Sequence, residues 1–407
     1  MTKRRATPCV ILIACLTLSP AATAQDAAQQ PAGSGDARAI GQATVVEVQL
    51  ADGVRTEGRL TLPPADADTP ESAIVRTLVV FVHGTGPGSY LTKRPLGAGR
   101  TFNYFDVFAE AFTERRIGFF SYNKRGVTNA QEPPWFDAVD REIFRTAVPI
   151  AEADDLASMV LALKRHERLA DARVVLLGAS EGTIVAALAA ERHPDLIDAI
   201  ILTGYCHDNM YDVIAYQFQG HGSMLVLGPV FDADADGVIS REEYGSEREE
   251  VARYRAAVMG AATFEVLDAN ADGVLDAADF AIRQRILHNM LLHAVETGNE
   301  EWIWNNYFRI SIEWLRAHFA LEANKTRLLR LDLPIYVLHG ENDAHVPAES
   351  VRDLEARFRA VGKTNLEAHV FADHDHDLNF MEWLIADEPP AGIGKLLECV
   401  ERIDAGR

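Results

Sequence analysis

Runs of apolar residues of strand length alternate with amphipathic stretches along much of the chain. Apolar runs lie in the segments 77–84, 117–126, 172–180 and 196–204, and stretches with helical spacing of apolar residues separate them. Alternation of this kind is typical of βαβ units, in which helices cover both faces of a parallel sheet. The pattern therefore predicts an α/β fold built on a mostly parallel sheet.

The pattern differs at the start and in the middle of this region. Residues 43–63 alternate apolar and polar side chains on both sides of Asp52-Gly53, which predicts a β-hairpin. The strand–helix alternation stops near residue 206 and resumes with "LPIYVLHG" at 333–340, followed by "EAHVF" and a C-terminal helix. We therefore predict a core in two parts, 43–206 and 328–407, with a helical insertion at 207–327.

The N-terminus carries the pattern of a bacterial secretory signal peptide. Three basic residues precede the apolar run "VILIACLTL", and Ala22-Thr23-Ala24 forms a small-residue cleavage site. This predicts a signal peptide at 1–24, export to the periplasm or the exterior, and a disordered linker at 25–42. An alternative is a lipoprotein anchor on Cys15, because "LIAC" resembles a lipobox. The apolar run is too short to span a bilayer.

Charge and cysteine content narrow the partners and the chemistry. The chain has 39 Lys+Arg against 60 Asp+Glu, which argues against nucleic acid or anionic lipid as a partner. Two of the four cysteines lie in the predicted signal peptide, leaving Cys206 and Cys399. They allow one disulfide, although two buried thiols are the favoured interpretation.

The segment "GASEG" at 178–182 places Ser180 between a buried strand and a helix. In this setting G-x-S-x-G is a nucleophile elbow, a strained turn that exposes the serine Oγ above the sheet. The alternative is a glycine-containing turn that only serves packing. The loop "HGTGPG" after the first parallel strand can aim the backbone N–H of Thr85 at the same point as that of Glu181, and two such donors stabilise an oxyanion.

A nucleophilic serine needs a base, and the base needs an orienting acid. Asp343 follows the next-to-last strand, and "DHDH" after the last strand offers His374 and His376. We favour His376, because five residues separate it from Val370 and leave room for the loop to fold back. His83 and His339 each stand in a His-Gly pair at a strand end and are interpreted as structural.

The segments "HGTGPGS", "SYNKRG", "GASEG" and "GENDAHVP" together resemble the α/β-hydrolase superfamily. The resemblance covers about 43–205 and 328–404, and the combination of segments is similar to secreted bacterial esterases and serine-aminopeptidase-like hydrolases. It implies Ser180 as nucleophile, Asp343 as acid, His376 as base, and the amides of Thr85 and Glu181 as oxyanion donors. The doubled "DHDH" departs from the single histidine usual in this family.

Two acidic segments of the insertion, 232–243 and 268–279, each fit the calcium-binding loop of an EF-hand. The residues at the ligand positions are Asp232, Asp234, Asp236, Val238, Ser240 and Glu243 in the first loop and Asp268, Asn270, Asp272, Val274, Asp276 and Asp279 in the second. Calcium prefers hard oxygen ligands of this kind. The sequence therefore predicts two Ca²⁺ sites in a helical cap.

Three details qualify this pair of loops. Asp279 is shorter than the usual glutamate, which predicts a second site that is weaker or closer to Mg²⁺. Ile239 and Leu275 occupy equivalent places and are expected to pair across the two loops. The glycines and the proline in "QGHGSMLVLGPV" predict an irregular helix before Asp232.

The segment 300–319 concentrates aromatic residues with helical spacing. It predicts one helix that packs the insertion onto the sheet, or that lines an apolar substrate pocket as part of a cap. These two roles are compatible.

The leading hypothesis is an exported, calcium-binding serine hydrolase that cleaves an ester or amide bond in a small-molecule or peptide substrate. A carboxylesterase is favoured over a peptidase or aminopeptidase, because no acidic cluster in the cap can be assigned to a substrate amine rather than to calcium. The alternative of another class is a non-catalytic, calcium-sensing binding protein on a hydrolase scaffold.

Overall fold

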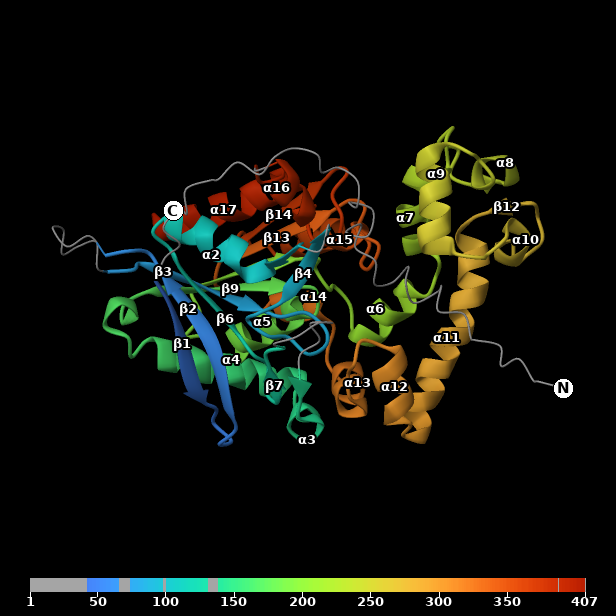
Figure 1. The fold of residues 1–407 in the computed structure, drawn as a ribbon. Coiled ribbons are helices and arrows are strands. Elements are labelled where there is room, and N and C mark those ends of the chain that lie inside the picture. Colours follow the sequence, from blue (N-terminus) through green and yellow to red (C-terminus); the bar gives the residue numbers. More distant parts are fainter. Residues whose placement is uncertain (1–41, 66–73, 98–99, 131–137, 387, 407) are drawn as a thin grey trace.

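The computed structural model describes residues 42–65, 74–97, 100–130, 138–386 and 388–406 (Figure 1). The predicted signal peptide, Cys15 and the predicted linker up to residue 41 lie outside these ranges. Gln42, which was assigned to the linker, is the first residue of a strand.

One sheet of eight strands forms the centre of the fold, in the order β1-β2-β6-β3-β9-β10-β13-β14. The pairs β1–β2 and β2–β6 are antiparallel, and the remaining pairs are parallel. This confirms both the mostly parallel sheet and the hairpin around Asp52-Gly53. The strands are β1 (Gln42–Gln49), β2 (Arg55–Leu62), β3 (Thr77–Val82), β6 (Gly118–Tyr122), β9 (Arg173–Ala179), β10 (Ala199–Thr203), β13 (Ile335–Gly340) and β14 (Leu366–Phe371).

Helices cover both faces of this sheet. Successive strand residues point to opposite sides, and apolar residues on both sides pack against these helices. In β9, Val174 and Leu176 join one apolar core, whereas Val175 and Leu177 join the other. The first core includes α4 (Pro149–Leu163), α5 (Gly182–Arg192) and α15 (Glu349–Ala360). The second includes α2 (Tyr104–Glu114), α16 (Phe380–Ala386) and α17 (Ala391–Asp404).

The two remaining cysteines lie in different cores. Cys206 belongs to the first and Cys399 to the second, and both are buried free thiols. The sheet therefore separates them, which confirms the interpretation as two thiols.

A helical insertion connects β10 to β13 and lies beside the sheet (Figure 1). It has an apolar core of its own, which includes Phe231, Ile239, Leu275 and Phe280. Its elements are α6 (Met210–Gln217), α7 (His221–Phe231), β11 (Ile239–Ser240), α8 (Arg241–Tyr244), α9 (Glu249–Tyr254), a π-helical turn (Arg255–Met259), α10 (Phe264–Leu267), β12 (Val274–Leu275), α11 (Ala277–Thr297), α12 (Glu300–Asn306), α13 (Ile312–Phe319) and α14 (Asn324–Leu328).

The insertion departs from the sequence-based expectations in two places. The helix before Asp232 is continuous, with Pro229 inside its last turn. The expectation of one helix over 300–319 is wrong, because α12 and α13 are separated by a turn in which Phe308 and Arg309 have φ of 46° and 52°. Ser311 starts the second helix by accepting a hydrogen bond from the Trp314 N–H.

The smaller elements complete the chain around the sheet. They are β4 (Lys93–Gly97), β5 (Arg100–Asn103), β7 (Val127–Thr128), β8 (Ala138–Val139), α3 (Arg141–Phe144) and a 3₁₀ turn (Glu167–Leu169). Among the helices of the described ranges, none has both the length and the apolar character that crossing a membrane requires.

Candidate functional site

Ser180 lies on a sharp turn between β9 and α5. Its φ is 56°, in the left-handed region that non-glycine residues seldom adopt. A Cβ on Gly178 would lie 2.5 Å from the carbonyl oxygen of Gly182, and one on Gly182 would lie 2.2 Å from that of Val82. Both glycines are therefore required by the close approach of backbone to backbone, which is the geometry predicted for a nucleophile elbow.

Two neighbouring loops surround Ser180. Its N–H donates to the Thr203 carbonyl at the end of β10 over 2.9 Å. On the other side, a Cβ on Gly84 would lie 3.3 Å from Cβ and 4.0 Å from Oγ of Ser180. Ser180 thus lies at the carboxyl edge of the sheet, between the ends of β3 and β10.

His376 and Asp343 form a direct pair at the same edge. Nδ1 of His376 lies 2.7 Å from Oδ2 of Asp343. Asp343 is buried, and its Oδ1 accepts the backbone N–H groups of His345 and Val346. The chain that follows β13 therefore holds Oδ1, while Oδ2 faces the His376 imidazole and also lies 3.3 Å from Nε2 of His339.

His374 is held elsewhere in the same loop. Its Nδ1 lies 2.8 Å from the Ala372 carbonyl oxygen, and its Nε2 accepts the N–H of Gly392. Of the two candidate bases, His376 is therefore the one placed against Asp343.

Gly204 brings His376 close to the serine turn. A Cβ on Gly204 would lie 2.5 Å from Cε1 and 3.1 Å from Nε2 of His376. Gly204 directly follows Thr203, whose carbonyl oxygen accepts the Ser180 N–H. The imidazole and the serine turn therefore flank the same strand end.

The charges around His376 favour its protonated form. Burial would lower the pKa of His376, but the Asp343 carboxylate and its hydrogen bond, aided by Asp377 and Asp375, raise it to about 9. Burial would raise the pKa of Asp343, but the charge and hydrogen bond of His376 lower it below the usual range. The pair thus stabilises an imidazolium, the species that a general base becomes.

The predicted oxyanion donors, Thr85 and Glu181, lie on the two loops that meet at Ser180. Thr85 lies between Gly84 and Gly86, and Glu181 is the residue between Ser180 and the first turn of α5. The Glu181 side chain is buried, and it binds Trp314 and His318 of α13.

The prediction from sequence missed several residues around this site. Arg94 of β4 binds Asp377 over 3.2 Å and stacks over the Tyr104 ring at 4.0 Å, so it holds the loop that carries His376. The His345 ring lies 4.6 Å from that of His376. Nothing local in the sequence marks Arg94, because its partner lies in a distant segment.

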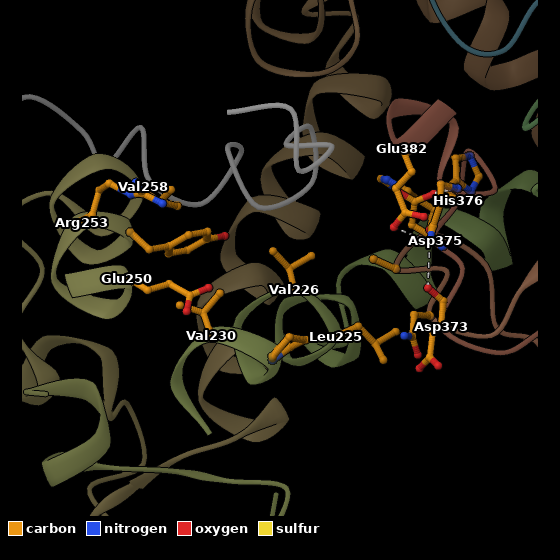
Figure 2. A pocket seen from close by; sticks show the side chains of 16 residues that line it. Leu225, Val226, Val230, Glu250, Arg253, Val258, Asp373, Asp375, His376 and Glu382 are labelled. Atoms are coloured by element: carbon orange, nitrogen blue, oxygen red, sulfur yellow. Dashed lines mark hydrogen bonds between the residues drawn. The ribbon is translucent and has the colours of Figure 1, made fainter. Parts of the chain in front are cut away.

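A pocket of about 350 Å³ lies beside His376 (Figure 2). Aliphatic side chains from α7, including Leu225, Val226 and Val230, form one wall. Most of the remaining lining residues are polar, namely Asn342, His345, Asp373, Asp375, His376, Asn379 and Glu382 from the core and Glu250 and Arg253 from α9, and Tyr254, Val258 and Ala344 complete the lining. The insertion and the core therefore build this pocket together.

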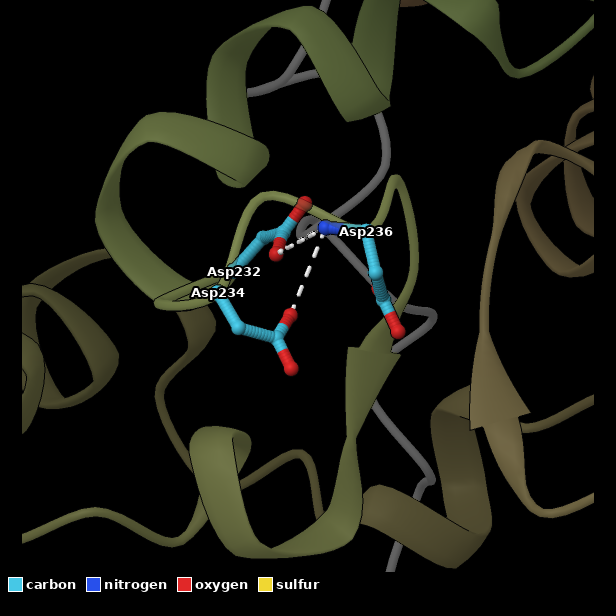
Figure 3. Close-up of side chains that lie close together, drawn as sticks. All are labelled: Asp232, Asp234 and Asp236. Carbon is cyan, nitrogen blue, oxygen red and sulfur yellow. Dashed lines mark hydrogen bonds between the residues drawn. The ribbon is translucent and has the colours of Figure 1, made fainter.

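In the first acidic loop, backbone N–H groups donate to the side chains of its aspartates (Figure 3). Oxygens of Asp232, Asp234 and Asp236 lie within 4.8 Å of one another. The Asp236 N–H donates to Asp232 and Asp234, and the Gly237 N–H donates to Asp232. Proximity to Asp236 raises the pKa of Asp234, so the loop gathers like charges that an added cation would neutralise.

The second acidic loop repeats this hydrogen bonding. The Asp272 N–H donates to Asp268 and Asn270, and the Gly273 N–H donates to Asp268. Between the loops, Ile239 pairs with Leu275 in a short antiparallel ladder, as expected.

The loops differ at their last ligand position. Asp279 is buried and lies within 4.8 Å of Asp268 and Asp272, despite its short side chain. Glu243 is outside the corresponding group of the first loop, and its carboxylate accepts the N–H groups of Ala233 and Ser240.

Part of the chain matches a sequence family, and most of the chain resembles solved structures in its fold. Residues 77–238 match the sequence family described as alpha/beta hydrolase fold, whereas no curated protein matches the chain. Similar solved structures include a lipase in an open form, with 15% identity and a TM-score of 0.49 over 89% of this chain and 99% of that chain. A thermostable carboxyl esterase from Bacillus coagulans has 14% identity and a TM-score of 0.48 over 89% and 98% of the two chains. An acylaminoacyl peptidase from Pyrococcus horikoshii has 12% identity and a TM-score of 0.46 over 89% of this chain and 41% of that chain.

Proposed function

We propose that this chain, whose central sheet has the α/β-hydrolase fold, is a serine hydrolase that cleaves a carboxylic ester. One observation carries the proposal: Ser180, with φ of 56°, lies at the strand end where Gly204 packs against the His376–Asp343 pair. Strained backbone at a serine, next to a paired histidine and carboxylate, is the arrangement that nucleophilic acyl transfer needs.

The proposed reaction uses an acyl-enzyme intermediate. His376 accepts the proton of the Ser180 hydroxyl while Oγ attacks the ester carbonyl, and the N–H groups of Thr85 and Glu181 bind the resulting oxyanion. Asp343 holds the imidazole and stabilises its protonated form. The proton then passes to the leaving alcohol, and a water molecule releases the acid by the same steps.

The pocket beside His376 supports a small-molecule substrate. Its aliphatic wall from α7 suits an apolar group of an ester, and its volume of about 350 Å³ is in the range of ligand pockets. A second candidate, an aminopeptidase, is favoured by one feature of the same pocket. Glu250, Asp373 and Glu382 line it, and carboxylates of this kind pair with a free amino group.

A fluorophosphonate probe, an ester panel and a peptide panel test this proposal. We expect the probe to label the wild-type protein and not Ser180→Ala, and p-nitrophenyl esters to be hydrolysed faster than aminoacyl p-nitroanilides. The reverse order of the two panels would establish the aminopeptidase. Absence of labelling in a folded wild-type protein would leave the calcium-sensing binding protein as the function.

We also propose that the two acidic loops hold Ca²⁺. The carboxylates of Asp232, Asp234 and Asp236 and the matching residues of the second loop would provide the oxygen ligands, and the bound ion would neutralise their charge. The support is the donor chemistry, the convergence of the oxygens and the repeated hydrogen bonding of the two loops. Isothermal titration calorimetry with Ca²⁺ and with Mg²⁺ would measure the number of sites and test whether the second prefers Mg²⁺.

Residues 1–24 are proposed to direct export, which would place the loops where calcium is plentiful. The support is the basic, apolar and small-residue sequence pattern alone. N-terminal sequencing of the protein from the periplasm or medium should start at Gln25. A lipid-modified N-terminal Cys15 would instead establish the anchored form.

A further inference from the structure

One segment of the insertion contacts both loops that carry the proposed oxyanion donors. The turn at Phe308 lies against the first loop, because a Cβ on Gly86 would be 2.8 Å from the Phe308 carbonyl oxygen. Helix α13 contacts the second, because Nε1 of Trp314 donates to Oε1 of Glu181 over 2.7 Å. This segment is the aromatic one that the sequence assigned to packing or to a cap.

Among the described residues, the partners of the Glu181 carboxylate are side chains distant in sequence. Besides the Trp314 bond, Nε2 of His318 lies 2.9 Å from Oε1, and Nζ of Lys124 lies 3.6 Å from Oε2. All four side chains are buried, and Lys124 is shared with the buried Glu152 at 3.1 Å. Burial would raise the pKa of Glu181, but the charge of Lys124 and the hydrogen bonds of His318 and Trp314 lower it, so the residue next to Ser180 carries an ionised carboxylate.

We propose that Glu181 is a positioning residue: its carboxylate, held by Trp314 and His318, fixes the orientation of its own backbone N–H toward the oxyanion. The inference rests on the proposed function, because it assigns a role within the same acyl-transfer site. It makes α13 the part of the insertion that sets the geometry of catalysis.

The backbone around Glu181 explains why such anchoring matters. Glu181 precedes the first turn of α5 and follows a strained residue, and no side chain caps this helix end. The Ser180 carbonyl of the same peptide unit accepts the N–H and the Oγ1–H of Thr183 over 2.9 and 2.7 Å, so the direction of the Glu181 N–H depends on this turn together with the anchored Glu181 side chain. Phe308 and Arg309, on the segment that approaches Gly86, are also in the left-handed region, and strain of this kind persists only where the surrounding contacts over-determine it.

The main test is Trp314→Phe, which removes the N–H donor and keeps an aromatic ring. Trp304→Phe is the matched control, since the Trp304 ring contacts Arg141, Phe144 and Arg309 of the same segment and not the Glu181 carboxylate. We expect Trp314→Phe to lower kcat by about 5- to 30-fold. This is larger than the effect of losing one ordinary hydrogen bond and smaller than the effect of losing an oxyanion donor itself. KM should stay within about twofold, because the interaction acts in the transition state.

Inhibition by an alkyl trifluoromethyl ketone gives a readout that a purely structural role would not move. This inhibitor forms a tetrahedral adduct with an oxyanion, so its Ki should weaken by the same factor as kcat/KM. Equal kcat and equal Ki for Trp314→Phe and Trp304→Phe would overturn the proposal. So would a loss of activity that tracks a lower melting temperature and disappears on cooling.

The conservative variant at Glu181 gives an independent arm. In Glu181→Gln the amide oxygen can still accept from Trp314 and His318, so we expect kcat to stay within about fivefold of wild type, whereas Glu181→Ala should lose at least tenfold more. Equal losses in the two variants would overturn the proposal. Failure of the proposed function is distinguishable, because the fluorophosphonate probe would then not label the wild type at all.

Discussion

At the residue scale, three consecutive side chains in the loop after β14 have separate tasks. Asp375 accepts the N–H groups of Asp377 and Asn379 and so shapes the loop. His376 turns toward Asp343, and Asp377 turns toward Arg94. In this run of alternating acids and histidines, Asp375 therefore shapes the loop, His376 is the proposed base and Asp377 anchors the loop to Arg94, whereas the sequence alone left the base open between two histidines.

The two histidines of this loop should respond differently to substitution. His376→Ala is expected to reduce kcat/KM on an ester to nearly the level of Ser180→Ala, because nucleophile and base act as a unit. His374→Ala should cost less activity, since its ring bridges Ala372 and Gly392 and packs against Phe371, away from Asp343. Steady-state kinetics of the two variants on one p-nitrophenyl ester would decide, and the opposite ranking would make His374 the base.

We expect kcat/KM to be highest at alkaline pH. The base must be neutral to accept a proton, and the pKa of His376 is raised to about 9, so kcat/KM should rise with pH up to that value instead of levelling off near about 6.5. Asp377 is one of the groups that raise this pKa, so Asp377→Asn should move the rising limb to lower pH. Asp171→Asn, at an exposed position before β9, is the control. A rising limb unmoved by Asp377→Asn would contradict this account.

At the scale of elements, the junction of β9 with α5 requires glycine at positions where a side chain would collide with the backbone. Gly182→Ala would force a Cβ to 2.2 Å from the Val82 carbonyl oxygen, so we expect it to lower the free energy of unfolding by about 1–3 kcal/mol. Gly394→Ala, inside α17 with open space around it, should instead raise it by about 0.5–1 kcal/mol. Urea titrations followed by tryptophan fluorescence measure both, and equal stability of the two variants would contradict the steric argument.

Elements with a local period were predictable from the sequence, and contacts between distant segments were not. The apolar runs of β3, β9 and β10 predicted the parallel sheet, and the repeat of the acidic loop predicted the pairing of Ile239 with Leu275. The split of 300–319 into α12 and α13 carries no glycine or proline signal. The Ser311 N-cap is a local signal for the start of α13, whereas the approach of Phe308 to Gly86 and the bond from Trp314 to Glu181 are tertiary contacts.

At the scale of the whole molecule, α7 links the acidic loops to the pocket. Leu225, Val226 and Val230 line the pocket beside His376, and the same helix ends at Phe231, directly before Asp232. Any change in the first loop therefore acts on the end of a helix that forms a wall of the pocket.

Removal of Ca²⁺ should consequently change both stability and activity. A ligand present at 100 times its Kd stabilises the folded form by about 2.7 kcal/mol, so EGTA should lower the melting temperature by several degrees and alter kcat/KM. Asp232→Ala should remove much of this calcium-dependent difference. Glu242→Gln, an exposed position of the same loop outside the proposed ligands, should retain it. Identical melting curves with and without chelator would contradict the calcium proposal.

The two buried thiols lie on opposite faces of the sheet, so their reactivity can be used to measure local opening of each face separately. Burial raises the pKa of both thiols, so alkylation by iodoacetamide requires each site to open first. Cys206 lies where the chain leaves β10 for the insertion, and Cys399 lies in α17. Their alkylation rates, resolved by mass spectrometry, therefore measure two separate opening equilibria. If calcium holds the insertion in place, chelation should accelerate alkylation of Cys206 and leave that of Cys399 unchanged.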